Sequence, residues 1–192
     1  MKNYLPFLAL LFVAFIYSKG NCAQGIKNLE ENYGFKKYKL NSKFVMGYGV
    51  KHKDDDGADR IVIDYAREFI GEIPVKTIEL FYVNDTLSKI IVNVLPDYYV
   101  KLKEACENSF GPPTQNISFN DKMQIDSSVS VNYFKDNYAW KAKNFKLEYY
   151  YLYPRTKSGA YGNKTLQLIY VMNNYSDRLK RMKRTSGASK SF

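Results

Sequence analysis

Two parts of the chain alternate between apolar and polar residues on both sides of a turn, which is the pattern of a β-hairpin. The first part covers residues 75–83 and 87–94, and Asn84, Asp85 and Thr86 supply turn chemistry between them. One face of this hairpin carries Ile78, Leu80, Tyr82, Ile90, Val92 and Val94. A face of this kind predicts two antiparallel strands that bury one side and leave the other largely solvated.

The second hairpin lies near the end of the chain, over residues 145–153 and 164–172. Its apolar face carries Phe145, Leu147, Tyr149, Tyr151, Tyr153, Leu166, Leu168, Tyr170 and Met172. Residues 154–163, which contain glycine, form a long connection between the strands. The two hairpins can belong to one continuous antiparallel sheet.

Shorter strands are predicted elsewhere with weaker patterns. They cover residues 43–51, 60–65, 129–134 and 138–143, with residues 135–137 as a turn between the last two. Residues 114–128 are polar and predict a loop.

One helix is well marked, over residues 96–110. Pro96 suits a first helical turn, and Gly111 followed by two prolines predicts where the helix ends. Tyr99, Leu102, Cys106 and Phe110 recur at spacings of three and four and form one apolar stripe. The order of elements therefore predicts an α+β fold: an antiparallel β-sheet built from hairpins, with the 96–110 helix packed on one face.

Residues 1–23 have the pattern of a cleavable secretory signal. A lysine precedes an uncharged apolar run over residues 5–17, which is shorter than the roughly 20 residues that a bilayer span needs. Cleavage after Gly20 or after Ala23 fits the small residues there. An uncleaved anchor and lipidation at Cys22 remain alternatives. The pattern predicts export to the periplasm or the outside of a bacterial cell, with no transmembrane segment in the mature chain.

The composition of residues 24–192 indicates a globular part followed by a basic tail. The chain is 45% hydrophobic and 16% aromatic, so residues 24–177 are predicted to fold as a single α+β domain. The net charge of +10 is concentrated near the end, where residues 178–192 hold six basic residues and no acid: Arg178, Lys180, Arg181, Lys183, Arg184 and Lys190. These residues predict a disordered basic tail, either simply solvated or contacting an anionic surface. The predicted export disfavours nucleic acid as a partner.

The usual nucleophile and base pairs are not readily assembled from this sequence. His52 is the only histidine and stands between two lysines next to a turn, which predicts a solvated side chain. Cys106 lies on the apolar stripe of the helix, where a thiol is buried and inert. The sequence contains no glycine-rich phosphate loop, CxxC pair or HExxH motif, so no catalytic residue and no cofactor is predicted.

The acidic run around Asp54 to Asp59 is a candidate metal site, with Asp54, Asp56 and Asp59 as ligands. An EF-hand alignment fails because its first position is His52 and its twelfth is Ile63. A calcium-binding turn of another kind and a simple acidic hairpin loop both remain open.

Aromatic side chains supply the candidate binding residues, namely Tyr150, Tyr153 and Trp140. Tyr150 falls on the face opposite the apolar one, where an exposed ring can stack on a sugar or a peptide. The sequence thus favours an exported, non-catalytic binding or envelope-associated module whose partner is a protein, a glycan or an anionic envelope surface. The alternative is a hydrolase that uses two of the 19 carboxylates.

Overall fold

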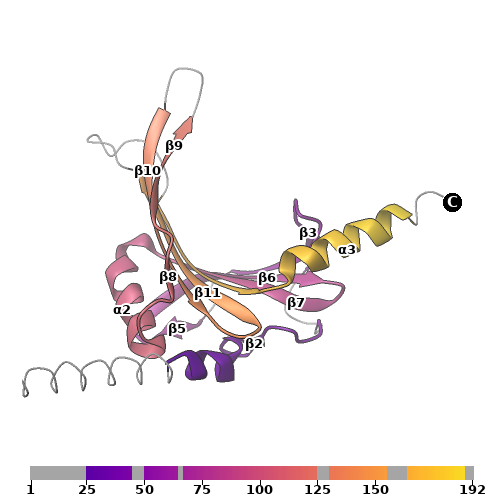
Figure 1. Cartoon of the computed structure of the whole chain (residues 1–192), viewed down its shortest axis with the longest axis horizontal. Coiled ribbons are helices and arrows are strands. Elements are labelled where there is room, and N and C mark those ends of the chain that lie inside the picture. The colour runs from indigo at the N-terminus through magenta and orange to yellow at the C-terminus, as the bar shows by residue number, and fades with distance from the viewer. Residues whose placement is uncertain (1–24, 45–49, 65–66, 125–129, 155–163, 189–192) are drawn as a thin grey trace, which may run out of the picture.

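A computed structural model describes residues 25–44, 50–64, 67–124, 130–154 and 164–188. Its main feature is a ten-stranded antiparallel sheet with the order β3-β4-β6-β7-β12-β11-β10-β8, in which β5 also pairs with β6 and β9 with β10 (Figure 1). The strands are β3 (His52–Lys53), β4 (Asp59–Asp64), β5 (Phe69–Ile70), β6 (Ile73–Val83), β7 (Thr86–Val94), β8 (Gln115–Asn116), β9 (Phe119–Gln124), β10 (Ser130–Lys141), β11 (Phe145–Pro154) and β12 (Thr165–Met172). The predicted α+β class is confirmed.

The first predicted hairpin is confirmed as β6 and β7. Asn84 and Asp85 form its turn with φ angles of 51° and 56°. Two consecutive residues with positive φ make the turn whose twist matches that of the flanking strands, and Asn and Asp tolerate this conformation best among non-glycine residues. The predicted apolar face of β6 and β7 is the buried one.

The second hairpin is also confirmed, but the strand before it is longer than the sequence pattern predicts. Residues 135–137, predicted as a turn, continue β10 without a break and pair with residues 150–152 of β11. Residues 114–128, predicted as a loop, contain β8 and β9, which pair along β10. Regular pairing on both sides of β10 satisfies its backbone groups and overrides the turn preference of Asp136 and Asn137.

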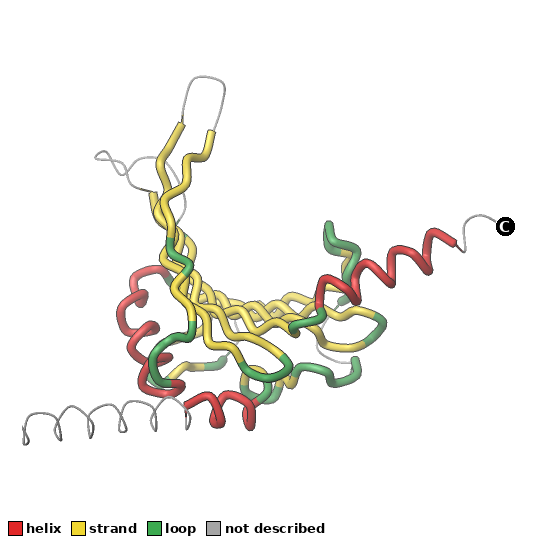
Figure 2. Tube along the Cα trace, in the orientation of Figure 1, coloured by secondary structure: helices red, strands yellow, loops and turns green. Residues whose placement is uncertain are grey.

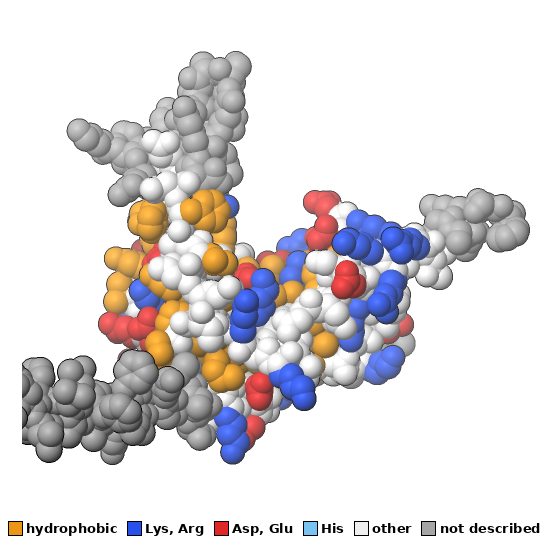
Figure 3. Space-filling model, in the orientation of Figure 1, with side chains coloured by type: hydrophobic (Ala, Val, Ile, Leu, Met, Phe, Trp, Pro, Cys, Tyr) orange, Lys and Arg blue, Asp and Glu red, His pale blue; other side chains and the backbone are white. Residues whose placement is uncertain are grey.

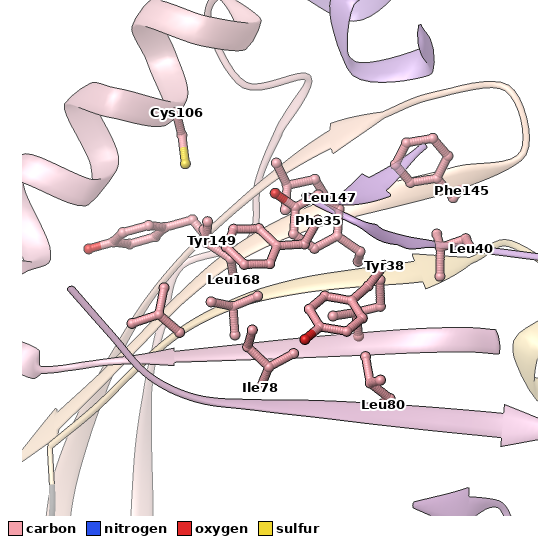
Figure 4. Close-up of a cluster of buried hydrophobic side chains, with 14 of the residues drawn as sticks. Phe35, Tyr38, Leu40, Ile78, Leu80, Cys106, Phe145, Leu147, Tyr149 and Leu168 are labelled. Carbon is pink, nitrogen blue, oxygen red and sulfur yellow. The ribbon is translucent and has the colours of Figure 1, made fainter. Parts of the chain in front are cut away.

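One face of the sheet is covered by α2 (Tyr99–Phe110), which follows the short helix η1 (Pro96–Tyr98), and by residues 25–44. Residues 25–32 are helical, and β1 (Gly34–Phe35) and β2 (Tyr38–Lys39) form a small separate hairpin. Cys106 of α2 and Phe35 and Leu40 of the N-terminal segment are buried against the sheet (Figure 4). Leu102 of α2 and Leu29 of the N-terminal segment are buried in the same cluster. This face holds the main core.

Among the described elements, the other face carries a helix only at one end. There α3 (Tyr175–Ala188) packs Tyr175 and Leu179 against Ala58, Phe81 and Val83. The sequence predicts a disordered tail from residue 178, whereas residues 178–188 are helical. Leu179 and Met182 explain the difference, because their spacing from Tyr175 gives the basic segment an apolar stripe that the sheet can bury.

The rest of this second face has no covering helix among the described elements, and we call it the open face. Figure 2 shows that the sheet bends, with β9 and β10 rising at one end and α3 leaving at the other, so that the open face is concave. Among the described residues, none of the helices has the length and apolar character needed to cross a bilayer. The predicted signal over residues 1–23 lies outside the described part.

Candidate functional site

A row of polar side chains crosses the open face from strand to strand, and we call it the polar row. Its members are Asn137 of β10, Tyr150 of β11, Gln167 of β12, Asn93 of β7 and Thr77 of β6. Each member is the direct register partner of the next. Side chains at such positions stand close enough to touch, so the row is a continuous polar surface perpendicular to the strands.

Hydrogen bonds order one half of this row. The Gln167 amide donates to Asn93 Oδ1 at 2.8 Å, and Asn93 Nδ2 lies 2.8 Å from both Thr77 Oγ1 and Glu79 Oε1. Arg60 completes the chain, with its Nε donating to Glu79 Oε2 at 2.9 Å. Side chains that are hydrogen-bonded to one another in this way lose rotamer freedom before a ligand binds, which lowers the entropic cost of binding.

Asn137 ends the other half of the row with an unmet acceptor. Its residue is 9% exposed, and its Oδ1 atom is buried and has no hydrogen-bond partner in the described part of the structure. A buried carbonyl without a partner is costly, so native structures rarely leave one without a reason.

A β-bulge shapes the end of the row near Thr77. Val75 pairs with Val94 and Thr77 with Asn93, so Lys76 is an extra residue in β6. The bulge brings Lys76 beside Thr77 at the edge of a pocket of about 320 Å³, as bulges often do when they redirect a side chain. The pocket is lined by Lys76, Thr77, Glu79, Asn93, Val94, Leu95, Pro96, Lys164, Thr165 and Leu166.

Two half-buried carboxylates stand on the open face, Glu79 and Glu148. They occupy one register row with Ile91 and Ile169 between them. Three strand spacings of about 4.8 Å put their Cα atoms roughly 14 Å apart. Arg60 pairs with Glu79, and Lys146 with Glu148. This pair therefore gives no support to the carboxylate hydrolase.

The three predicted binding aromatics lie in different places. Tyr150 is in the polar row. Tyr153 is half-buried on the opposite face, stacked on Tyr151 with ring centroids 4.8 Å apart. Trp140 is fully buried and donates its indole N–H to the carbonyl of Gly111, so it belongs to the core and not to a contact surface. Only Tyr150 joins the site.

The predicted metal ligands are not drawn together. Asp54 and Asp56 lie in the turn between β3 and β4, whereas Asp59 begins β4 and pairs with Lys51 and Lys53. No group of three or more His, Cys, Asp or Glu side chains suited to a metal ion occurs in the described ranges. The metal site remains a prediction without structural support.

His52 and Cys106 lie on different elements in different surroundings. His52 is exposed in β3, while Cys106 is buried in α2 and 2% exposed. Burial raises the pKa of the Cys106 thiol to about 12, with a smaller contribution from the charge of Glu107. The thiol stays protonated at neutral pH, and a protonated thiol is a poor nucleophile.

The alternating pattern of the sequence did not identify most residues of the site. Thr77, Glu79, Asn93 and Gln167 are the polar members of the alternating strands, which the pattern assigns only to a solvated face. Their amide and hydroxyl side chains are a signal of a polar binding surface. The sequence does not show the strand order that aligns β6, β7 and β12.

Comparisons with protein-family models, with curated proteins and with solved structures find no match for this chain. The polar row, the pocket and the bend of the sheet are therefore the basis for a functional proposal.

Proposed function

We propose that the protein is an exported, non-catalytic binding module whose open face contacts a hydroxyl-rich polymer of the cell envelope, such as a glycan. The observation that carries this proposal is the hydrogen-bonded polar row on a concave sheet face. An ordered chain of amides on a face that no described helix covers contributes little to a core, and its hydrogen bonds fix it in one geometry.

The chemistry of the polar row favours hydroxyl groups over a simple anion. An amide presents both a donor and an acceptor, as does a hydroxyl group, so the two can pair in either direction. Thr77 and Tyr150 add hydroxyls of the same dual character, and Tyr150 also offers an apolar ring body. The carboxylate of Glu79 within the same network disfavours a purely anionic ligand.

The direction of the polar row fits an extended ligand. It crosses from β10 to β6 and ends beside the pocket at the start of η1. A polymer lying across the strands would meet each member of the row in turn and place one unit in the pocket. Export, the other half of the proposal, rests on the signal-like residues 1–23.

Co-sedimentation with protein-free and lipid-free cell-wall polymer, prepared by boiling envelopes in detergent, tests this proposal. The chain from residue 24 should pellet with the polymer. The double variant Thr77→Val and Gln167→Met, which removes ligand-facing polar groups at similar volume, should lose most of this binding. A matched control, Thr185→Val with Asn173→Leu, changes the same kinds of group outside the polar row and should bind normally. The proposal would be contradicted if the double variant bound the polymer as well as the control variant does.

A further inference from the structure

The helix α3 has two chemically different sides. Tyr175, Leu179 and Met182 face the sheet, where they pack with Ala58, Phe81 and Val83. At 100° per residue, the positions opposite this apolar side are Asp177, Lys180, Arg181 and Arg184. All four are exposed. We call Lys180, Arg181 and Arg184 the basic arc.

Several contacts hold α3 in place. Arg178 donates to Ser88 Oγ at 3.3 Å and to Asn41 Oδ1 at 3.1 Å. Ser88 is available because a second irregularity, between the pairs of Phe81 and Tyr82, gives β7 an extra residue at this point. Lys89 lies under the helix, with its Nζ 3.8 Å from the Phe81 ring and 5.0 Å from the Tyr175 ring. The basic arc is therefore presented by a docked helix.

The acidic residues around α3 lie closer to some of its basic side chains than to others. Lys183 and Met182 extend to Gly57, next to the acidic turn of Asp54, Asp55 and Asp56. The basic arc points away from the sheet that carries this turn, and Asp177 is the only acid within α3. Figure 3 shows Lys and Arg side chains gathered over α3 on the face in view. The basic arc thus keeps a net positive charge.

We propose that the basic arc of α3 is a docking surface for a bilayer rich in anionic lipid. Arginine guanidinium groups match phosphate oxygens in a bidentate geometry, and lysine adds an unspecific charge. Because the apolar side of α3 is already buried against the sheet, binding is electrostatic adsorption at the headgroups and not insertion. This proposal uses none of the residues of the polar row, so either proposal can fail without the other.

Vesicle co-sedimentation of the chain from residue 24 tests the proposal. The probes are phosphatidylcholine vesicles with and without 40% phosphatidylglycerol, at low salt and at about 0.5 M salt, where charge interactions are screened within a few ångströms. The test variant is Lys180→Gln with Arg181→Gln and Arg184→Gln. The matched control, Lys27→Gln with Lys36→Gln and Lys101→Gln, removes the same charge from exposed positions on the N-terminal segment and α2.

The expected result is binding only to the anionic vesicles, lost at high salt. The test variant should bind about 100-fold more weakly, from about fivefold for each basic residue near an anionic leaflet, while the control changes little. A variant with Lys180→Arg should retain binding, and circular dichroism should show all variants folded. Equal loss in test and control variants, or binding to soluble heparin but not to vesicles, would overturn the proposal; the second result would point to an acidic polysaccharide.

Discussion

The indole Nε1 of Trp140 donates a hydrogen bond of 2.8 Å to the carbonyl oxygen of Gly111. Gly111 is the residue at which α2 ends, with a φ of 74° that favours glycine. This bond joins the end of the helix to the C-terminal end of β10, and Trp140 is fully buried.

Replacing Trp140 with phenylalanine should destabilise the protein by about 2–4 kcal/mol, because it leaves a buried carbonyl without a partner and opens a small cavity. Chemical denaturation measures this loss. Tyr138→Phe is a suitable comparison, since it removes the half-buried bond from Lys103 Nζ and should cost about 1 kcal/mol or less. Similar costs for the two variants would show that the indole bond contributes little.

Asn93 should matter more for stability than Gln167, although both belong to the polar row. Asn93→Leu removes the partner of Thr77, Glu79 and Gln167 together, and should cost about 1–3 kcal/mol. Gln167→Met removes one peripheral bond and should cost about 1 kcal/mol or less. Urea denaturation of both variants tests this order, and the reverse order would mean that Asn93 does not hold the row together.

The Cys106 thiol should make the protein less stable at alkaline pH. Its pKa is raised from 9.0 to about 12 in the folded chain, so between these values the unfolded chain loses a proton that the folded chain keeps. The free energy of unfolding should fall there by about 1.4 kcal/mol per pH unit from this group alone. In Cys106→Ala that part of the slope should vanish, while the part from Tyr149 and Tyr170, whose pKa values burial also raises, should persist. An unchanged slope in Cys106→Ala would contradict this assignment.

Leu179→Ala should loosen α3 without unfolding the sheet. Leu179 is 8% exposed and lies in the small cluster that joins α3 to β6. Its truncation should cost about 2 kcal/mol of docking free energy, at the lower end for a leucine because the cluster lies at the edge of the fold. Hydrogen exchange should show faster exchange in residues 175–188 and unchanged protection in β6 and β12. Thr185→Ala, at an exposed position of the same helix, is the control.

The sequence predicted the elements in which one physical signal dominates. The β6–β7 hairpin has alternating apolar residues over most of both strands and a turn of Asn84 and Asp85, and α2 has an apolar stripe ended by Gly111, so local chemistry and tertiary packing agree there. The prediction missed β8, β9 and the continuity of β10, where residues such as Asp136 and Asn137 have turn preferences that long-range pairing overrides.

The candidate site was predictable only in part, for a similar reason. Tyr150 was identified from alternation within one strand. Asn93, Gln167 and Thr77 come from three strands whose order in the sheet places them side by side, and that order is a long-range property. Trp140 was misplaced because alternation alone did not show that its side of β10 faces α2.

The side of the sheet on which α3 rests determines how the molecule would sit on a bilayer. Since α3 lies on the concave side of the sheet, its exposed basic side chains point in the same direction as the open face. A molecule held by those charges would turn its hollow toward the headgroups, with the convex, core-bearing side outward. Material captured in the hollow would then be confined in the narrow aqueous layer next to the lipid.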